Sequence, residues 1–453
     1  MGSIEGKSGG NTNGPGVPPE VERGLVRTFR FLTNEFRGYY KAQKVPSPPR
    51  LSRREFAFTF FGKNFMMRHT AFRQREDLSR FLGLRVPSSA YYSTAYYRTP
   101  DAGTMGEKDW LGADLIFDLD ADHIPGAENL SFEDMLAGVK KEFEKLIYDY
   151  LIGDFGFREK DIEVVFSGGR GYHIHITRQD VLALTSHQRR EIVDYITGKG
   201  LDMEKFLTKK AIGVKNAGSR FSKVNYIHNL HPTTEGGWKG KFTRGTLEWI
   251  VGARMNPEQA LKELTSIKGV GKKKAEAIML QLKESDIGKM NVDAMADGQA
   301  FVDPGQWIRD HPDFTLESNR ELLRSGQATM DIFPTDDIRK AFMKFIIEKV
   351  AINLGGETDE PVTADIKRLI RLPGSLHGKT GFRVIPMSLK ELEDFEPLTD
   401  SIVLSDKMVD FEVKQGISGR VGEERFSFPA GEKVEVPAYL AAFIAGRKAG
   451  FII

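Results

Sequence analysis

The stretch "DLIFDLDADH" (residues 114–123) sets three aspartates at alternate positions directly behind an apolar run. Alternate side chains of a β-strand point to the same face of its sheet. In a strand the carboxylates of Asp118 and Asp120 would lie side by side, opposite an apolar face formed by Leu115, Phe117 and Leu119. Like charges this close repel one another, which indicates that a positive group lies between them. The stretch therefore predicts a strand with one face in a core and the other at a charged site.

Several explanations of the aspartates compete. An EF-hand loop also begins D-x-D-x-D, but it requires Gly sixth and Glu twelfth, where this chain has His123 and Asn129. An EF-hand is therefore excluded. A phosphatase with an aspartyl nucleophile also places D-x-D after an apolar strand, and it stays open as an alternative that needs a later lysine and acidic pair. A strand end with solvated acids is a further alternative.

A two-metal site is the explanation that links the aspartates to a reaction. Residues two apart on a strand have Cα atoms about 6 to 7 Å apart. Two carboxylates so placed can bridge a pair of Mg²⁺ or Mn²⁺ ions roughly 3.5 to 4 Å apart, and oxygen ligands suit these hard cations. Nucleotidyl transfer needs this arrangement, because one ion activates the attacking 3′-hydroxyl and the other holds the triphosphate. A third carboxylate would complete such a site.

Two glycine-containing turns offer phosphate contacts. In "FSGGRGYHIHI" (166–176) the glycines allow close approach of backbone to a phosphate, and Ser167, Arg170 and His173 add polar groups. The turn "GSLHGKT" (374–380) is one residue short of a P-loop and follows a helix-like stretch instead of a strand, so an ATPase is rejected. It still gathers basic side chains around one turn: Arg371, His377 and Lys379.

The remaining patterns predict a mixed α/β core interrupted by an insertion. Strands are expected at 53–61 and in a hairpin over 161–176, with a helix over 131–151 between them. The segment 365–386 is expected to contain a helix, a turn at Pro373 and a strand.

The domain bounds follow from these patterns and from charge. They are a disordered tail (1–22), a first part of the core (23–186), a helical basic insertion (187–325), and a second part of the core with a C-terminal helix (326–453). From Lys205 to Arg244 the insertion has nine Lys or Arg residues and one acid. Its segment "IKGVGKKKAEAI" (267–278) is similar to a helix-hairpin-helix, which binds nucleic-acid phosphates, although a hairpin used for packing alone is an equal alternative.

Composition narrows the class of protein. The chain has 453 residues, 40% apolar and 28% charged, which fits a globular protein of two or three domains. It contains no cysteine, so disulfides and thiolate zinc sites are excluded and a cytoplasmic location is expected. No apolar run approaches the roughly 20 residues that cross a bilayer, so no membrane association is expected.

Four motifs together resemble one family. "RREFAFTF", "FDLDAD", "FSGGRGYHIHI" and "DEPVTADIKRLIRLPGSLHGKTGFRV" occur in this order between about Phe29 and Pro397. They are similar to the catalytic (small) subunit of the archaeal and eukaryotic DNA primase, in its archaeal form. The resemblance implies an α/β (α+β) fold with a mixed-sheet primase-type core and an inserted, mainly helical subdomain. It implies a DNA-directed nucleotidyltransferase that makes short primers on single-stranded DNA from NTPs or dNTPs.

The resemblance also implies roles for particular residues and partners. Asp118 and Asp120 match the family's metal-binding pair, and Asp359 matches its third metal carboxylate, for two Mg²⁺ or Mn²⁺ ions. The implied nucleotide contacts are Ser167, Arg170, His173, Arg371, His377 and Arg54. A large regulatory subunit is implied as the partner in a heterodimer.

One departure and two alternatives accompany the resemblance. Many members carry a zinc-binding knuckle of Cys and His after the catalytic pair, whereas this chain offers only His123 there, so no structural zinc is expected. A repair or end-filling polymerase of the same superfamily is the nearest alternative function. A non-catalytic nucleic-acid-binding protein is the alternative from another class.

Overall fold

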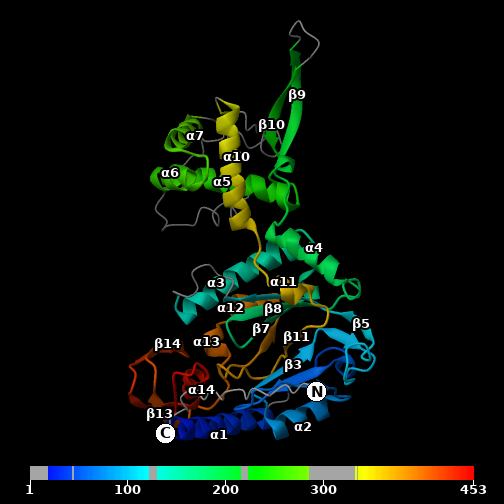
Figure 1. The fold of residues 1–453 in the computed structure, drawn as a ribbon, viewed down its shortest axis with the longest axis vertical. Coiled ribbons are helices and arrows are strands. Elements are labelled where there is room, and N and C mark those ends of the chain that lie inside the picture. Colours follow the sequence, from blue (N-terminus) through cyan, green and yellow to red (C-terminus); the bar gives the residue numbers. More distant parts are fainter. Residues whose placement is uncertain (1–18, 43–44, 122–129, 216–222, 285–331, 334) are drawn as a thin grey trace, which may run out of the picture. The chain divides into compact units, whose positions relative to one another are not determined.

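The computed structural model describes residues 19–42, 45–121, 130–215, 223–284, 332–333 and 335–453 (Figure 1). They form two compact units. The first unit comprises Met1–Phe143, Arg158–Val193 and Thr358–Ile453, and the second comprises Glu144–Phe157 and Asp194–Glu357. The predicted disordered tail lies outside the described residues up to residue 18. Residues 19–22 already belong to helix α1 (Pro19–Ala42), whose first turn contains Pro19 and two glutamates, which favour a helix start.

The sheet that carries the aspartates has the order β12-β7-β8-β6 and is antiparallel throughout. Its strands are β6 (Leu115–Asp120), β7 (Ile162–Phe166), β8 (Gly171–Ile176) and β12 (Ile385–Met387). The predicted hairpin is confirmed as β7 and β8, and the predicted aspartate strand as β6. Helix α3 (Phe132–Lys145) follows β6 along the chain and continues as a π-helical stretch over Leu146–Ile152, in place of the single helix expected.

A second antiparallel sheet of the first unit has the order β11-β3-β1-β2. It consists of β1 (Phe56–Thr59), β2 (Met67–Thr70), β3 (Ser89–Ser93) and β11 (Leu369–Arg371). The helix expected from residue 365 is wrong, because Leu369–Arg371 pairs with Tyr91–Ser93 at the sheet edge and Ile370 is buried there. A short helix, α11 (Glu360–Ala364), precedes β11 instead.

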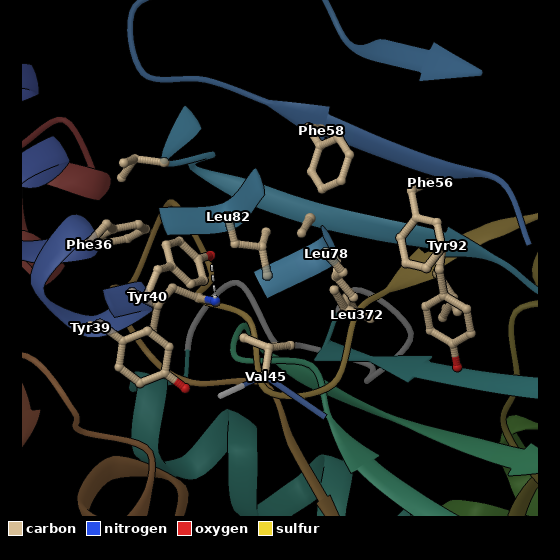
Figure 2. Packing of buried hydrophobic residues seen from close by; sticks show 14 of the residues in the cluster. Phe36, Tyr39, Tyr40, Val45, Phe56, Phe58, Leu78, Leu82, Tyr92 and Leu372 are labelled. Atoms are coloured by element: carbon tan, nitrogen blue, oxygen red, sulfur yellow. Dashed lines mark hydrogen bonds between the residues drawn. The ribbon is translucent and has the colours of Figure 1, made fainter. Parts of the chain in front are cut away.

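An aromatic core joins this sheet to two helices, α1 and α2 (Arg75–Arg85). Figure 2 shows Phe36 and Tyr40 of α1, Phe56 and Phe58 of β1, and Tyr92 of β3 among the buried side chains of this core. At the edge of this core, two tyrosine hydroxyls form hydrogen bonds with the backbone of the turn at residues 374–380. Tyr39 donates to the carbonyl of Gly374 (2.8 Å), and Tyr40 accepts from the N–H of Leu376 (3.2 Å). The core thereby fixes the turn that carries His377.

The rest of the first unit consists of short elements. A three-stranded sheet has the order β16-β13-β17, with β13 (Met408–Val413), β16 (Lys433–Pro437) and β17 (Gly450–Ile452). The C-terminal helix is confirmed as α14 (Ala438–Gly446), most of whose side chains are buried. The other elements are β4 (Ala95–Tyr97), β5 (Trp110–Ala113), β14 (Ile417–Val421), β15 (Glu424–Phe428), α12 (Leu389–Asp394), α13 (Pro397–Asp400), and the 3₁₀ turns Leu51–Arg53 and Glu159–Asp161.

The second unit contains helices and one long hairpin. The helices are α5 (Gly237–Met255), α6 (Pro257–Ser266), α7 (Lys272–Glu284) and α10 (Asp336–Leu354), and the 3₁₀ turn Met203–Phe206 precedes the hairpin. The hairpin β9 (Leu207–Lys215) and β10 (Lys223–Leu230) departs from the mostly helical expectation for 187–325. Helix α4 (Ser186–Thr197) crosses from the first unit into the second.

The bounds of the second unit differ from those predicted for the insertion. Helix α10 falls in the second unit, although the sequence placed it in the second part of the core. Its buried face, including Phe342, Phe345 and Ile346, packs in the helical unit. Among the helices of the described residues, none has the length and apolar character needed to cross a membrane.

Candidate active site

Strand β6 presents the two predicted metal ligands at its C-terminal end. The side chains of Leu115, Phe117 and Leu119 are fully buried on one face, while Asp118 and Asp120 are partly exposed on the other. Asp118 lies opposite His173 of β8, and Asp120 lies opposite Gly171. The alternation in the sequence thus places both carboxylates on the face of the sheet opposite Leu115, Phe117 and Leu119.

Asp359, the third predicted ligand, is joined to Asp118 by a hydrogen bond between their main chains. It directly precedes α11, and its N–H donates to the carbonyl oxygen of Asp118 (2.9 Å). This contact joins two residues 241 positions apart in the sequence. Within the described parts of the chain, no three His, Asp or Glu side chains converge closely enough to form a ready-made metal site.

The three aspartates nevertheless act on one another electrostatically. Burial, followed by the charges of Asp120 and Asp359, raises the pKa of Asp118 to about 7. Arg368 and Arg371 oppose this shift. A carboxyl with so high a pKa stays partly protonated near neutral pH, and a bound cation would remove the repulsion. The donor set therefore fits a hard divalent cation such as Mg²⁺ or Mn²⁺.

The first glycine turn joins β7 to β8 and faces the aspartates. A guanidinium nitrogen of Arg170 lies 3.2 Å from an oxygen of Asp120, and His173 Nε2 lies 3.5 Å from an oxygen of Asp118. Ser167 accepts a hydrogen bond from the N–H of Gly169 (3.2 Å). Gly168 has φ +73°, a conformation that favours glycine, and a Cβ there would lie 2.8 Å from the Cβ of His377. This glycine therefore lets the two predicted phosphate turns touch.

The second turn holds a neutral histidine among cations. Burial, and then the charges of Arg371 and Lys379, lower the pKa of His377 well below its usual range. Its Nδ1 accepts from the N–H of Lys379 (3.3 Å), which leaves Nε2 to carry the proton. Thr380 donates from its hydroxyl to the carbonyl of Gly168 (2.5 Å), a second bond between the two turns.

Arg371 completes the basic side of the site. It lies on β11, which the mistaken helix prediction did not anticipate, and its guanidinium stacks on Tyr91 at 5.1 Å from the ring centre. Asp118 and Asp120 are the carboxylates that act on its charge. The strand β11 thus brings Arg371 to the aspartates from the neighbouring sheet.

These side chains enclose one cleft of about 690 Å³ in the first unit. Seven of the predicted site residues line it: Asp118, Asp120, Ser167, Arg170, His173, Arg371 and His377. Arg368, Lys379 and Arg447 also line it. The sequence marked Lys379 only as one of the basic side chains of the second turn, and it gave no role to Arg368 or Arg447. Arg368 lies within a quoted motif, whereas Arg447 is marked only as the first basic residue after an apolar helix. Asp359 lies behind Asp118 and does not line the cleft.

Arg54, which the sequence predicted as a nucleotide contact, does not line the cleft. Its side chain is fully buried and forms an ion pair with Asp114 at 2.6 Å. Its remaining donors bind Tyr96 and the carbonyls of Pro49 and Ser93. Arg54 therefore stabilises the core. Its N–H groups are all bound within the protein, so it has no free donor to offer a nucleotide.

A family model described as DNA primase small subunit matches residues 117–389, the span that contains the cleft's aspartates and both turns. The chain belongs to this family. It is 39% identical to the DNA primase small subunit PriS of Methanothrix thermoacetophila over 93% of this chain and 98% of that protein. The corresponding protein of Methanococcoides burtonii is 39% identical over 94% and 98%. That of Methanocella arvoryzae is 39% identical over 84% and 88%.

Membership of the primase family confirms the family resemblance and the predicted enzyme class. Primer synthesis by a DNA-directed nucleotidyltransferase is the activity of this family, and the α+β architecture agrees with it. The phosphatase alternative is thereby removed. The roles of individual residues, the metal ions and the expected lack of structural zinc stay predictions.

Proposed function

We propose that this chain is the catalytic subunit of a primase and starts chains on single-stranded DNA at the cleft beside β6. One observation carries the proposal: the carboxylates of β6 and two turns rich in phosphate-binding groups line the same cleft. Acidic groups suit cations, and Arg and backbone N–H groups suit a triphosphate. A site for nucleotidyl transfer needs both.

Asp118 and Asp120 would hold the metal ions, and Asp359 would complete the ligand set. When bound, Mg²⁺ or Mn²⁺ would lower the pKa of the attacking 3′-hydroxyl and neutralise charge on the triphosphate. In the structure, Arg170 contacts Asp120 and His173 contacts Asp118. With cations held by the aspartates, Arg170 and His173 would be free to contact a phosphate.

The two turns would orient the nucleotide. The groups of the cleft that would contact it are Ser167, Arg170 and the N–H groups of the first turn, together with Arg371 and His377. The protonated Nε2 of neutral His377 serves as a hydrogen-bond donor without adding another charge to a basic cleft. Catalysis would come from positioning and charge neutralisation.

The partners follow from the family. A protein described as a small subunit works with another chain, so we expect a large regulatory subunit in a heterodimer. The template would be single-stranded DNA, and the substrates NTPs or dNTPs. Assays of activity therefore need the chain both alone and together with that subunit.

The decisive test supplies an unprimed single-stranded template with nucleotides and Mg²⁺ or Mn²⁺. We expect dinucleotides and short oligomers that bear a 5′-triphosphate. Asp118→Asn should remove these products, because it removes a metal ligand. Asp101→Asn, at an exposed position outside the cleft, should leave them unchanged.

The alternatives predict other products. Extension of primed templates only, even with the large subunit present, would support a repair polymerase. Binding of DNA without any incorporation would support the non-catalytic alternative.

A further inference from the structure

Arg447 is a side chain of the cleft that the proposed roles do not use. It directly follows α14, outside the span matched by the family model, and lines the same cleft as Arg170 and His377. Its position is set by close contact between the backbone at Gly446 and that at Lys379. A Cβ at the preceding residue, Gly446, would lie 2.1 Å from the carbonyl oxygen of Lys379. The end of α14 therefore rests directly on the turn that carries His377.

The guanidinium of Arg447 is held in place without an acidic partner. It stacks on the rings of Phe443 (3.4 Å from the ring centre) and Phe132 (4.4 Å). One nitrogen donates to the carbonyl of Phe443 (3.3 Å). Within the described part of the chain no carboxylate pairs with it, so most of its five N–H groups have no protein acceptor. A cation held by aromatic rings beside other cations is arranged for an external anion.

The neighbouring charges indicate which anion. Burial and the charge of Arg170 lower the pKa of Arg447 to about 9. No carboxylate is among the causes of this shift, so the repulsion between Arg170 and Arg447 is not offset within the described residues. Arg447 also acts on His377. By contrast, Asp118 and Asp120 act on Arg371 and not on Arg447. In the cleft, Arg170 thus lies between the aspartates and Arg447, because it contacts Asp120 on one side and acts on Arg447 on the other, whereas no carboxylate acts on Arg447.

We propose that Arg447 binds the terminal phosphates of the nucleoside triphosphate. This inference rests on the proposed function, because the α-phosphate must lie near the aspartates for nucleotidyl transfer. The triphosphate then extends past Arg170 toward Arg447, where its distal oxygens supply the anion that Arg447 lacks. The C-terminal helix thereby takes part in nucleotide selection, and Arg447 distinguishes a triphosphate from a monophosphate.

The test compares the affinities of the full-length chain for a non-hydrolysable nucleoside triphosphate and for the monophosphate, both with Mg²⁺. Arg447→Met keeps the aliphatic stem between the rings and removes the charge. It should weaken triphosphate binding about ten- to a hundredfold and leave monophosphate binding unchanged, since it removes a charged hydrogen bond to phosphate. Arg447→Lys should recover part of the affinity. Lys448→Met, at the exposed neighbouring position, is the matched control and should bind both like the wild type.

The outcomes separate this inference from the proposed function. Equal triphosphate affinity in Arg447→Met and wild type would overturn the role of Arg447 alone. An equal weakening for both nucleotides would also overturn it, because that result indicates disturbed packing. If Arg447→Met melts below the assay temperature, Arg447→Gln gives the same comparison. A wild-type chain that bound no triphosphate would overturn the proposed function, and this inference with it.

Discussion

The carboxyl group of Asp118 links the metal-free state of the site to its stability. Its pKa is raised to about 7 in the folded chain, above the usual value of 3.8. The folded state therefore holds this proton more tightly than the unfolded state does. The protonated carboxyl's contribution to the free energy of unfolding is fully present below about pH 4. It is lost progressively as the pH rises from about 4 through 7 and the group ionises.

Asp118→Asn should accordingly stabilise the metal-free chain at alkaline pH. We expect its free energy of unfolding to exceed that of the wild type by about 1 to 3 kcal/mol near pH 8.5, and the difference to shrink toward pH 4. Denaturant titrations with a chelator present would measure this. Added Mn²⁺ should stabilise the wild type and not the variant. A wild type that is more stable than Asp118→Asn without metal would contradict the clustering of the three acids.

Arg54 shows how a basic residue in a family motif can serve the core. Its guanidinium stacks on Tyr96 at 4.2 Å and pairs with buried Asp114. Arg54→Met should lower the free energy of unfolding by roughly 3 to 5 kcal/mol, because it strands a buried carboxylate. Arg53→Met, at the exposed adjacent position, should change it by less than about 1 kcal/mol. Comparable small effects in both variants would return Arg54 to the candidate nucleotide contacts.

At the level of elements, the site depends on two turns that touch. Gly168→Ala would introduce a Cβ 2.8 Å from that of His377 at a φ of +73°. Gly431 has φ +88° with nothing within 4 Å of a Cβ, so Gly431→Ala is a control that shares the backbone strain and not the clash. Gly431→Ala should lower the free energy of unfolding by about 1 to 2 kcal/mol, and Gly168→Ala should lower it further, because the clash adds to the backbone strain. Only Gly168→Ala should also slow nucleotide incorporation, and equal rates in the two variants would refute the importance of this close approach.

The same elements show what the sequence could and could not predict. Alternation along 115–120 predicted β6 because one face is buried and the other is not. The strand β11 was mistaken for a helix, because Ile366 and Ile370 have helical spacing and its pairing with β3 depends on residues almost 280 positions away. The hairpin of β9 and β10 was obscured by the three lysines of β9, Lys209, Lys210 and Lys215. The role of Arg447 could not be predicted, because it depends on the packing of α14 against a distant turn.

At the level of the whole molecule, the second unit carries the hairpin similar to a helix-hairpin-helix. Helices α6 and α7 pack through buried Leu264, Val270 and Ile278, and the turn contains Gly269 at φ +96°. Lys272 and Lys273 are exposed, whereas Lys274 pairs with Asp337 (2.8 Å). Packing and phosphate binding are both compatible with this hairpin.

Neutralising the three lysines would decide between these roles. Lys272→Gln, Lys273→Gln and Lys274→Gln together should weaken binding to single-stranded DNA. They should also reduce the slope of affinity against salt by about 0.7 for each phosphate that the variant no longer binds. The matched control replaces three exposed lysines of the first unit, Lys390, Lys407 and Lys433. Unchanged affinity and salt dependence in the hairpin variant would leave the hairpin a packing element.

At the scale of the whole chain, we expect one cleft of the first unit to hold both the metal ions and the triphosphate. Anomalous diffraction from crystals soaked with Mn²⁺ and a non-hydrolysable nucleoside triphosphate tests it most directly. We predict manganese peaks about 2.0 to 2.4 Å from the carboxylate oxygens of Asp118 and Asp120, with the triphosphate in contact with Arg170 and His377. Manganese or nucleotide bound elsewhere, with this cleft empty, would contradict the claim.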